Sequence, residues 1–236
     1  MRIIRVKSYE ELSRKAADLI AAQILMKPDC VLGLATGSTP IGTYQNLIEK
    51  YQQGVLDFSQ VTTFNLDEYL GLTPDHPQSY RYFMNTNLFN HVNVRPECTH
   101  VPDGCADDPV AFGRAYDQAI LDHGRIDLQL LGIGNNGHIA FNEPADRFIP
   151  ETHVVELQQS TIEANKRFFN SIEEVPTQAI TLGIGTIMQA KKVLLIADGP
   201  AKKEAIEKSF FGPVCPEVPA SVLQLHPDLT VICNVD

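Results

Sequence analysis

A histidine and a glutamate, both suited to proton transfer, lie close together in one glycine-rich stretch of the chain. The stretch reads LLGIGNNGHIAFNEP over residues 130–144 and contains His138 and Glu143. Imidazole and carboxylate groups are common general acids and bases near neutral pH. The alternative is a tight turn with a structural histidine, but turns seldom need an imidazole, a carboxylate and three amide side chains together. The stretch therefore favours catalysis.

Two adjacent carboxylates, Asp67 and Glu68, make a second candidate. They follow the apolar run VTTFNL over residues 61–66. Two carboxylates at the end of a strand repel each other and lose solvation, unless they have partners or a function. Two interpretations stay open at this point, a functional pair and an ordinary polar loop.

A polar stretch with one glycine links another apolar run to a helical pattern. The apolar run covers residues 31–35, the helical pattern covers residues 41–51, and between them lie Thr36, Gly37, Ser38, Thr39 and Pro40. Proline is favoured at the start of a helix, where its missing N–H is not needed. Free N–H groups at a helix start, with two hydroxyls beside them, can bind an anion. The pattern lacks the signature of a nucleotide loop, so it predicts either an anion site or a plain helix cap.

Two lysines lie at the start of a later helix. Lys202 and Lys203 follow the apolar run of residues 193–197 and the turn DGP. Cations at a helix N-terminus oppose the helix dipole. A nearby anion would explain them, and a solvated charge pair would do so equally well.

Strand and helix patterns alternate along the whole chain, which predicts one α/β domain with a parallel sheet covered by helices on both faces. Loops that follow parallel strands meet at the carboxyl edge of the sheet, where ligands bind in such folds. All four candidate stretches lie in loops of this kind. A helix is also expected to begin at Ser79, and the side chains predicted on its buried face are Tyr82, Phe83, Leu88 and Phe89.

Composition excludes several other classes of protein. The chain has 236 residues and a formal net charge of −10, which argues against nucleic acid or an anionic membrane as the main partner but not against a small anionic substrate. Its five cysteines form no C-x-x-C pair and no metal-ligand spacing with histidine, so we expect reduced thiols, no metal and a cytoplasmic protein. No apolar run approaches the ~20 residues of a membrane span.

Four motifs, in order along the chain, resemble one known family. They are TGSTP, FNLDEYLGL followed by SYRYFMN, LGIGNNGHIAFNEP, and EANKRFF. These motifs are similar to those of the glucosamine-6-phosphate deaminase (isomerase) family. The resemblance implies a three-layer α/β/α sandwich of modified Rossmann-like type. It implies conversion of D-glucosamine 6-phosphate and water to D-fructose 6-phosphate and ammonia in amino-sugar breakdown, with neither a metal nor an organic cofactor.

The same resemblance implies roles for individual residues. Asp67 would remove the C2 proton of the substrate. His138 would open the pyranose ring, Glu143 would orient the His138 side chain, and Asn136 would belong to the same proton relay. The implied phosphate site consists of Gly37, Ser38, Thr39, Arg167 and Lys202, with Thr36, Glu68 and Lys203 as secondary candidates. The implied lid covers about residues 156–180 of a single domain spanning residues 1–236.

Two departures from the family pattern carry expectations of their own. Asn136 replaces an aspartate found in many members, and because an amide carries no charge, Glu143 is left as the charged partner of His138. Longer, hexameric members bind an activating N-acetylated sugar phosphate through basic residues, and the corresponding positions here are His153 and Val155. We therefore expect no activation by that effector. We favour a monomer, with a homo-oligomer as the alternative.

Two other functions compete with the deaminase. A 6-phosphogluconolactonase shares the family fold and a related histidine loop, but lactone hydrolysis needs no base for a C2 proton, so Asp67 and Glu68 together with the FNEP segment disfavour it. A non-catalytic sugar-phosphate sensor is the second alternative. The presence of every group needed for proton transfer disfavours the sensor.

Overall fold

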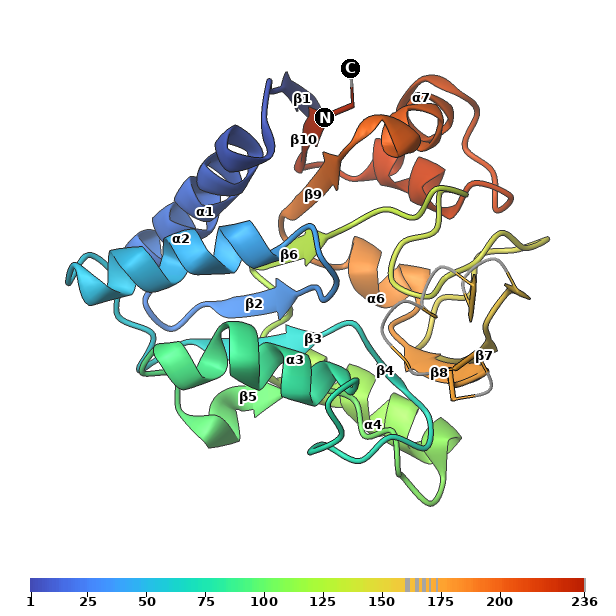
Figure 1. Cartoon of the computed structure of the whole chain (residues 1–236), viewed down its shortest axis with the longest axis horizontal. Helices are drawn as coiled ribbons and strands as arrows, with labels where there is room; N and C mark the ends of the chain where they lie inside the picture. The colour runs from blue at the N-terminus through green and yellow to red at the C-terminus, as the bar shows by residue number, and fades with distance from the viewer. Residues whose placement is uncertain (160–161, 164–165, 167–168, 170, 173, 236) are drawn as a thin grey trace.

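A seven-stranded sheet forms the centre of the computed structural model, which describes residues 1–159, 162–163, 166, 169, 171–172 and 174–235 (Figure 1). Every neighbouring pair of strands in this sheet is parallel. In spatial order the strands are β1 (Arg2–Arg5), β10 (Leu229–Asn234), β9 (Val193–Asp198), β6 (Leu128–Leu131), β2 (Val31–Leu34), β3 (Thr62–Asn65) and β5 (Thr99–His100).

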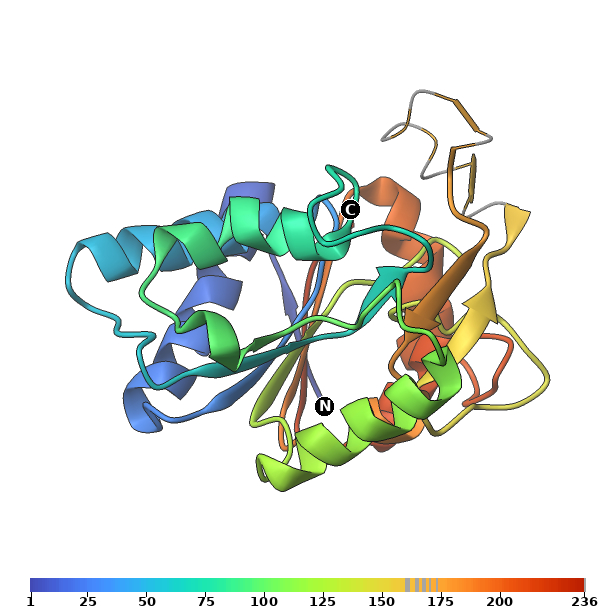
Figure 2. The same ribbon diagram turned by 90° about the horizontal axis from the view of Figure 1, so that it is seen from below.

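Helices cover both faces of this sheet, with α2 and α3 on one side and α4 on the other (Figure 2). This arrangement confirms the predicted three-layer α/β/α class. The α-helices are α1 (Tyr9–Met26), α2 (Ile41–Gln52), α3 (Tyr80–Asn87), α4 (Pro109–Asp122), α6 (Ile184–Met188) and α7 (Lys203–Phe211). The 3₁₀ helices are η1 (Phe89–His91), η2 (Pro96–Cys98), η4 (Pro200–Lys202) and η5 (Pro219–Leu225). Among the described residues, no helix is both long and apolar enough to cross a bilayer.

Side-chain caps fix where three of the helices begin. The side-chain oxygens of Ser8, Ser79 and Asp108 accept hydrogen bonds from N–H groups in the first turns of α1, α3 and α4. These bonds satisfy donors that have no partner inside the helix. The predicted start of a helix at Ser79 is confirmed.

The buried face of α3 differs from the prediction. Tyr82 is 41% exposed, whereas Met84 is fully buried. Leu88 and Phe89 are buried as predicted, but they lie beyond the last turn, at the C-cap and in η1. An eight-residue helix has too few turns for the apolar period to identify its inner face, so contacts with the sheet decide it.

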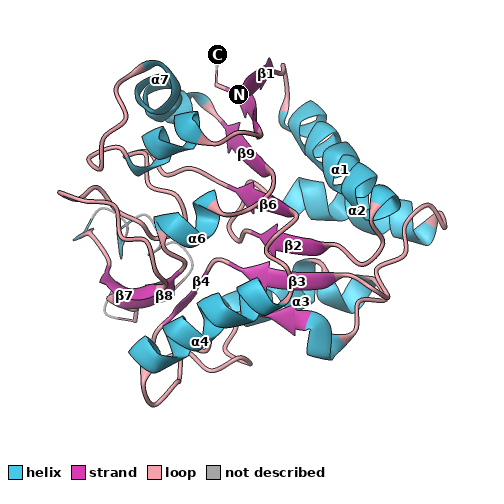
Figure 3. Cartoon of the chain, turned by 180° about the vertical axis from the view of Figure 1, so that it is seen from behind, coloured by secondary structure: helices cyan, strands magenta, loops and turns pink. Residues whose placement is uncertain are grey.

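A second, antiparallel sheet lies beside the main one and was not predicted. It consists of β4 (Asp67–Tyr69), β8 (Gln178–Thr181) and β7 (His153–Glu156), in that order (Figure 3). A separate apolar cluster packs against it, formed by Tyr69, Phe141, Leu157, Ile162, Val175 and Ala179. The two carboxylates that follow β3 therefore belong to a buried strand, and the polar-loop interpretation of Asp67 and Glu68 is wrong.

The order of strands in the main sheet reverses between β2 and β6. From β2 the chain proceeds outward to β3 and β5, and from β6 it proceeds outward in the other direction to β9 and β10. The crevice beyond the carboxyl ends of two such strands is where ligands bind in open α/β sheets. The loops at this crevice are residues 35–40 and 132–138.

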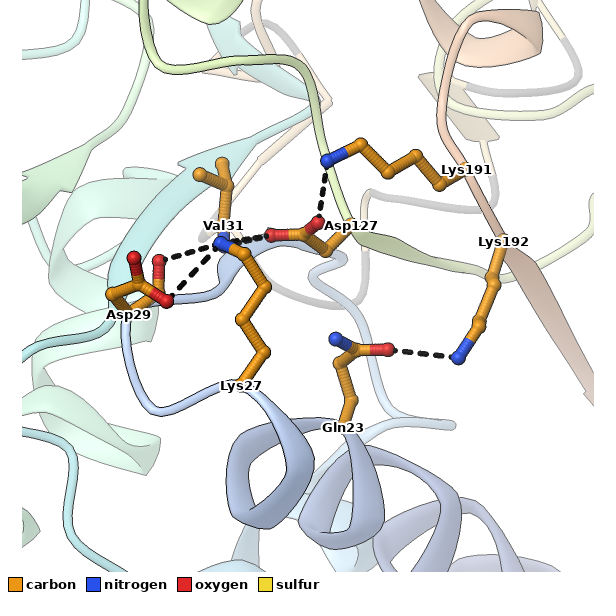
Figure 4. A network of polar contacts seen from close by, with 7 residues as sticks. All are labelled: Gln23, Lys27, Asp29, Val31, Asp127, Lys191 and Lys192. Carbon is orange, nitrogen blue, oxygen red and sulfur yellow. Dashed lines mark hydrogen bonds and ion pairs between the residues drawn. The ribbon is translucent and has the colours of Figure 1, made fainter.

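One buried carboxylate fastens the opposite, amino-terminal edge of the sheet. Asp127 Oδ2 accepts from the N–H of Val31 at 2.8 Å and from Lys27 Nζ at 3.0 Å, and Oδ1 accepts from Lys191 Nζ at 2.7 Å (Figure 4). Burial raises the pKa of Asp127, but the hydrogen bonds from Lys191, Val31 and Lys27 outweigh it and leave the pKa below its ordinary value. The start of β2 is thereby tied to the segment that leads into β9.

Asp127→Asn should lower the free energy of unfolding by about 1–3 kcal/mol at pH 7, because an amide cannot accept from two lysines and a buried N–H together. Since the pKa is lower in the folded than in the unfolded state, this stability is present above the unfolded pKa and is lost as the pH falls through the folded pKa. Urea unfolding of both proteins at a series of pH values should show the difference shrinking below about pH 4. A difference that does not change with pH would contradict this account. Asp29→Asn is the matched control, since the Asp29 side chain is 71% exposed.

Candidate active site

A cavity of about 350 Å³ lies at the crevice between β2 and β6. Its walls come from the loops after β2 and β6, from the start of β4 and from η4, so the predicted convergence of these segments on one edge of the sheet is found. The predicted site residues that line it are Thr36, Gly37, Ser38, Thr39, Asp67, Asn136, His138 and Lys202. Glu68, Glu143 and Lys203 are not in its wall, and Arg167 lies outside the described residues.

Asp67 is a buried carboxylate at the wall of this cavity. Only 6% of the residue is exposed, and none of the described residues donates a hydrogen bond to its carboxylate. Burial raises the pKa of Asp67 to about 8, with a further contribution from the negative charge of Glu68. A carboxylate held this way is a much stronger base than one in water. Its ionised form is poorly solvated, so taking up a proton lowers its free energy.

Glu68 points away from the cavity and joins β4 to α3. Its Oε1 accepts from the N–H groups of Tyr69 and Tyr80, both at 2.9 Å, and its Oε2 accepts from the N–H of Arg81 at 3.0 Å. Burial raises the pKa of Glu68 to about 7, although these hydrogen bonds oppose the shift. The residue is therefore a structural cap for α3 that also places a second negative charge beside Asp67.

Glu68→Gln should shift the pH dependence of catalysis. If Asp67 must be ionised to act, kcat/KM rises with pH through its pKa, and removal of the neighbouring charge lowers that pKa. We expect the acidic limb of the kcat/KM profile to move to lower pH by up to about one unit. Asp75→Asn, at an exposed loop position, is the control and should leave the limb in place. An unchanged limb in the Glu68 variant would show that the two carboxylates are not coupled.

His138, Glu143 and Asn136 form a compact group, of which His138 and Asn136 line the same cavity. His138 Nδ1 lies 3.3 Å from Glu143 Oε2, an ion-pair distance without the alignment of a hydrogen bond. The same Glu143 oxygen accepts from Asn136 Nδ2 at 2.8 Å, and Asn136 Oδ1 accepts from the His138 backbone N–H at 3.1 Å. Asn136 thus holds Glu143 in place. A carboxylate at position 136 would oppose Glu143 instead of donating to it, so the amide suits this arrangement.

Gly134 makes room for the ring of His138. A Cβ atom at position 134 would lie 2.4 Å from His138 Cε1 and 2.5 Å from both ring nitrogens. The Gly134 N–H also donates to the His138 carbonyl at 2.9 Å. The glycine is therefore required for close approach of a side chain, and it fixes where the imidazole lies.

The loop after β2 contains backbone N–H donors with no acceptor in the described part of the chain. The backbone N–H groups of Gly37, Ser38 and Thr39 donate to no acceptor among the described residues. Gly37 has a φ of 98°, a left-handed conformation that favours glycine. These three consecutive residues line the cavity, and successive N–H groups without an internal acceptor are typical of concave anion sites. Lys202 is half-buried in the same wall, whereas Lys203 is exposed.

Tyr80 and Phe141 line the cavity and were missed in the sequence. Their rings are stacked with centroids 6.0 Å apart, and both contact Tyr69 of β4. Proximity to Tyr69 and Asp67 adds to burial in raising the pKa of Tyr80 well above its ordinary value. The position of Tyr80 directly after the Ser79 cap was a signal in the sequence that it begins a helix. The sequence did not show that its N–H bonds to Glu68, which ties the start of this helix to β4.

Fold and site together define a class of α/β protein in which a cavity at the carboxyl edge of the sheet lies beside a buried carboxylate and a histidine–carboxylate pair. Residues 7–232 match the family described as Glucosamine-6-phosphate isomerases/6-phosphogluconolactonase, and the chain belongs to this family. A glucosamine-6-phosphate deaminase of Lachnoclostridium phytofermentans is 64% identical over 233 residues, which cover 99% of each chain. Another from Clostridioides difficile is 54% identical, over 99% of this chain and 94% of its own.

Solved structures agree with this assignment. A structure described as a monomeric glucosamine-6-phosphate deaminase superposes with a TM-score of 0.97 at 48% identity, covering 99% of this chain and 97% of its own. A 6-phosphogluconolactonase from Trypanosoma cruzi has a TM-score of 0.80 at 21% identity, covering 99% of this chain and 94% of its own, and shares the fold alone. The family expected from the motifs is confirmed.

Proposed function

We propose that this chain deaminates D-glucosamine 6-phosphate to D-fructose 6-phosphate and ammonia. The observation that carries the proposal is that one cavity joins the buried base Asp67 to His138 and to the unused N–H donors of residues 37–39. An isomerising deaminase needs all three: a base for carbon acid chemistry, an acid/base for ring opening, and an anchor for phosphate. The names of the relatives agree with the same reaction.

His138 opens the ring in this proposal. Its Nδ1 faces Glu143, which leaves Nε2 for the substrate. Ring opening breaks the C1–O5 bond, removes the proton of the C1 hydroxyl and delivers a proton to O5. An imidazole can do both at neutral pH, and the nearby Glu143 carboxylate stabilises the imidazolium that forms in between.

Asp67 acts on the open-chain aldose. It removes the C2 proton, and the electron pair of that bond forms the C1=C2 bond of an enolamine while the carbonyl oxygen gains a proton. Return of a proton to C1 gives an imine at C2. Water adds to this carbon, and ammonia leaves as the C2 carbonyl of fructose 6-phosphate forms. The raised pKa of Asp67 suits the removal of a weakly acidic proton.

The phosphate binds far from the reacting carbons and holds the sugar in register. Its proposed partners are the N–H groups and hydroxyls of residues 37–39 together with Lys202, which line the same cavity. Arg167, outside the described residues, is proposed as a further ligand on the lid of residues 156–180. Binding energy from a remote group is used to position the reacting atoms.

The test is release of ammonia from D-glucosamine 6-phosphate, measured together with formation of fructose 6-phosphate. Equal amounts of both products support the deaminase. Rapid hydrolysis of 6-phosphogluconolactone without ammonia would replace it by a lactonase, and sugar-phosphate binding without turnover would replace it by a sensor.

We also propose that N-acetylglucosamine 6-phosphate does not activate this enzyme. His153 and Val155, at the positions that correspond to the effector-binding basic residues, line a separate cavity of about 230 Å³ that borders Glu143. Val155 supplies no charge for a phosphate there. Initial rates should follow a hyperbolic curve with and without the effector. A sigmoidal curve that becomes hyperbolic on addition of effector would overturn this proposal.

A monomeric, cytoplasmic enzyme is proposed as well. None of the five cysteines forms a disulfide bond among the described residues, as expected in a reducing compartment. The similar solved deaminase is described as monomeric. Light scattering on the purified protein should give a mass near 26.2 kDa, and a multiple of that mass would establish the homo-oligomer.

A further inference from the structure

The first residue of α1 contacts the loop that faces the phosphate site. The hydroxyl of Tyr9 accepts from the N–H of Gly42 at 2.8 Å. The same hydroxyl lies 3.1 Å from the Thr39 carbonyl oxygen and 3.2 Å from that of Ser38, and its single proton is donated between them. One side chain therefore holds both the end of the loop and the first turn of α2.

This contact depends on a close approach of α1 to α2. A Cβ atom at Gly42 would lie 2.4 Å from Ser13 Oγ, 3.0 Å from Ser13 Cβ and 3.0 Å from the Tyr9 hydroxyl. Gly42 has an ordinary backbone conformation, so it is needed for space. The start of α1, capped by Ser8, is thus held directly against the loop.

We propose that Tyr9 is a positioning residue for phosphate binding, which fixes the loop of residues 37–39 through its backbone carbonyls. This inference rests on the proposed function of that loop. The peptide carbonyls of Ser38 and Thr39 face Tyr9, and the N–H groups of the same stretch have no acceptor among the described residues. The Ser38 carbonyl shares its peptide plane with the Thr39 N–H, so holding this carbonyl limits rotation of that donor. The Thr39 carbonyl belongs to the peptide bond with Pro40, which has no N–H, so the second contact fixes the end of the loop where α2 begins. The loop is therefore ordered before the ligand binds.

α2 has no side-chain cap of its own, which strengthens this assignment. Its N-cap residue is Pro40, and no side chain of the cap residue satisfies the first turn. The Tyr9 hydroxyl takes the Gly42 N–H in its place. Loss of the hydroxyl would leave that donor free to compete for the ligand or for water, and would loosen the turn that carries Ser38 and Thr39.

Tyr9→Phe should raise KM for D-glucosamine 6-phosphate about tenfold and change kcat less than about twofold, since remote binding is lost equally from ground and transition states. The dissociation constant of inorganic phosphate, measured by calorimetry, should rise by a similar factor. Gly42→Ala should act in the same direction by pushing Tyr9 and Ser13 away. The control is Tyr82→Phe, because Tyr82 is 41% exposed and its hydroxyl makes no hydrogen bond with the described residues.

Unchanged KM and unchanged phosphate affinity in both variants would overturn the role of Tyr9. A fall in kcat at constant KM would also overturn it, because the contact would then act on the chemical step. The phosphate measurement needs no turnover. If the wild-type protein binds phosphate but releases no ammonia, the proposed reaction fails and the role of Tyr9 is still decided by the calorimetry.

Discussion

Asp67→Asn is expected to lower kcat by about 10³-fold with little change in KM, because an amide of the same shape cannot accept the C2 proton. Its isosteric side chain leaves the cavity wall and the phosphate loop intact. Steady-state kinetics with ammonia as the readout gives both constants. Asp107→Asn, at an exposed position, is the control for loss of a carboxylate elsewhere. Turnover within tenfold of wild type would remove Asp67 from the role of base.

Asp67→Asn should also make the protein more stable than the wild type, and this difference should grow as the pH rises. Burial raises the pKa of Asp67 to about 8 in the folded state, against an ordinary value of 3.8. The folded state therefore keeps a proton that the unfolded chain has lost, so stability is complete below the unfolded pKa and falls as pH rises through the folded pKa. Asparagine does not ionise. The gain in unfolding free energy should grow from pH 4 to pH 8 and reach about 1 kcal/mol or more.

Thermal unfolding checks this gain. A difference of that size corresponds to roughly 2–4 °C in Tm for a chain of this length. The loss of kcat and the gain in stability are expected together in this variant. A catalytic group that is kept in an environment unfavourable to its charge commonly lowers the stability of the protein. A variant that is inactive and also less stable at pH 8 would indicate damage to the fold and would leave the base role unsupported.

The main sheet and the convergence of the site loops were predictable from the sequence. Apolar runs at residues 31–35, 128–133 and 193–197 have the length and composition of buried parallel strands. In a parallel sheet, the loops at the carboxyl ends of these strands must meet at one edge. Thr36, Asn136 and Lys202 are in the same cavity for that reason.

The second sheet was not predictable in the same way. β4 has three residues, and its partner β8 follows more than a hundred residues later. So short a strand has no readable alternation, and its pairing depends on tertiary contacts. For the same reason the residue pattern alone did not separate Asp67, which lines the cavity, from Glu68, which caps α3, and only the family resemblance gave them different roles. Successive side chains on a strand point to opposite faces, and the separation follows once the strand is known.

The geometry of His138 leads to the second prediction with a large effect. Gly134→Ala should lower kcat about 10²-fold, because a misplacement of about 1 Å is enough to break productive alignment. A methyl group at this position would lie within 2.5 Å of the imidazole ring, so the ring must move. Movement away from Gly134 changes the 3.3 Å approach of Nδ1 to Glu143 and the direction of Nε2 together.

Gly132→Ala is the matched control for this substitution. Gly132 precedes the same turn and lines the same cavity, yet a Cβ atom there would have no neighbour within 4 Å. We expect kcat of this variant to stay within about threefold of the wild-type value, and any larger effect to be on KM alone. Asp67 does not contact Gly134, so deuterium at C2 of the substrate separates the two halves of the reaction. In Gly134→Ala the isotope effect on kcat should shrink, because ring opening becomes the slow step. An undiminished isotope effect with a low kcat would place the damage at proton removal and would contradict the assignment of ring opening to His138.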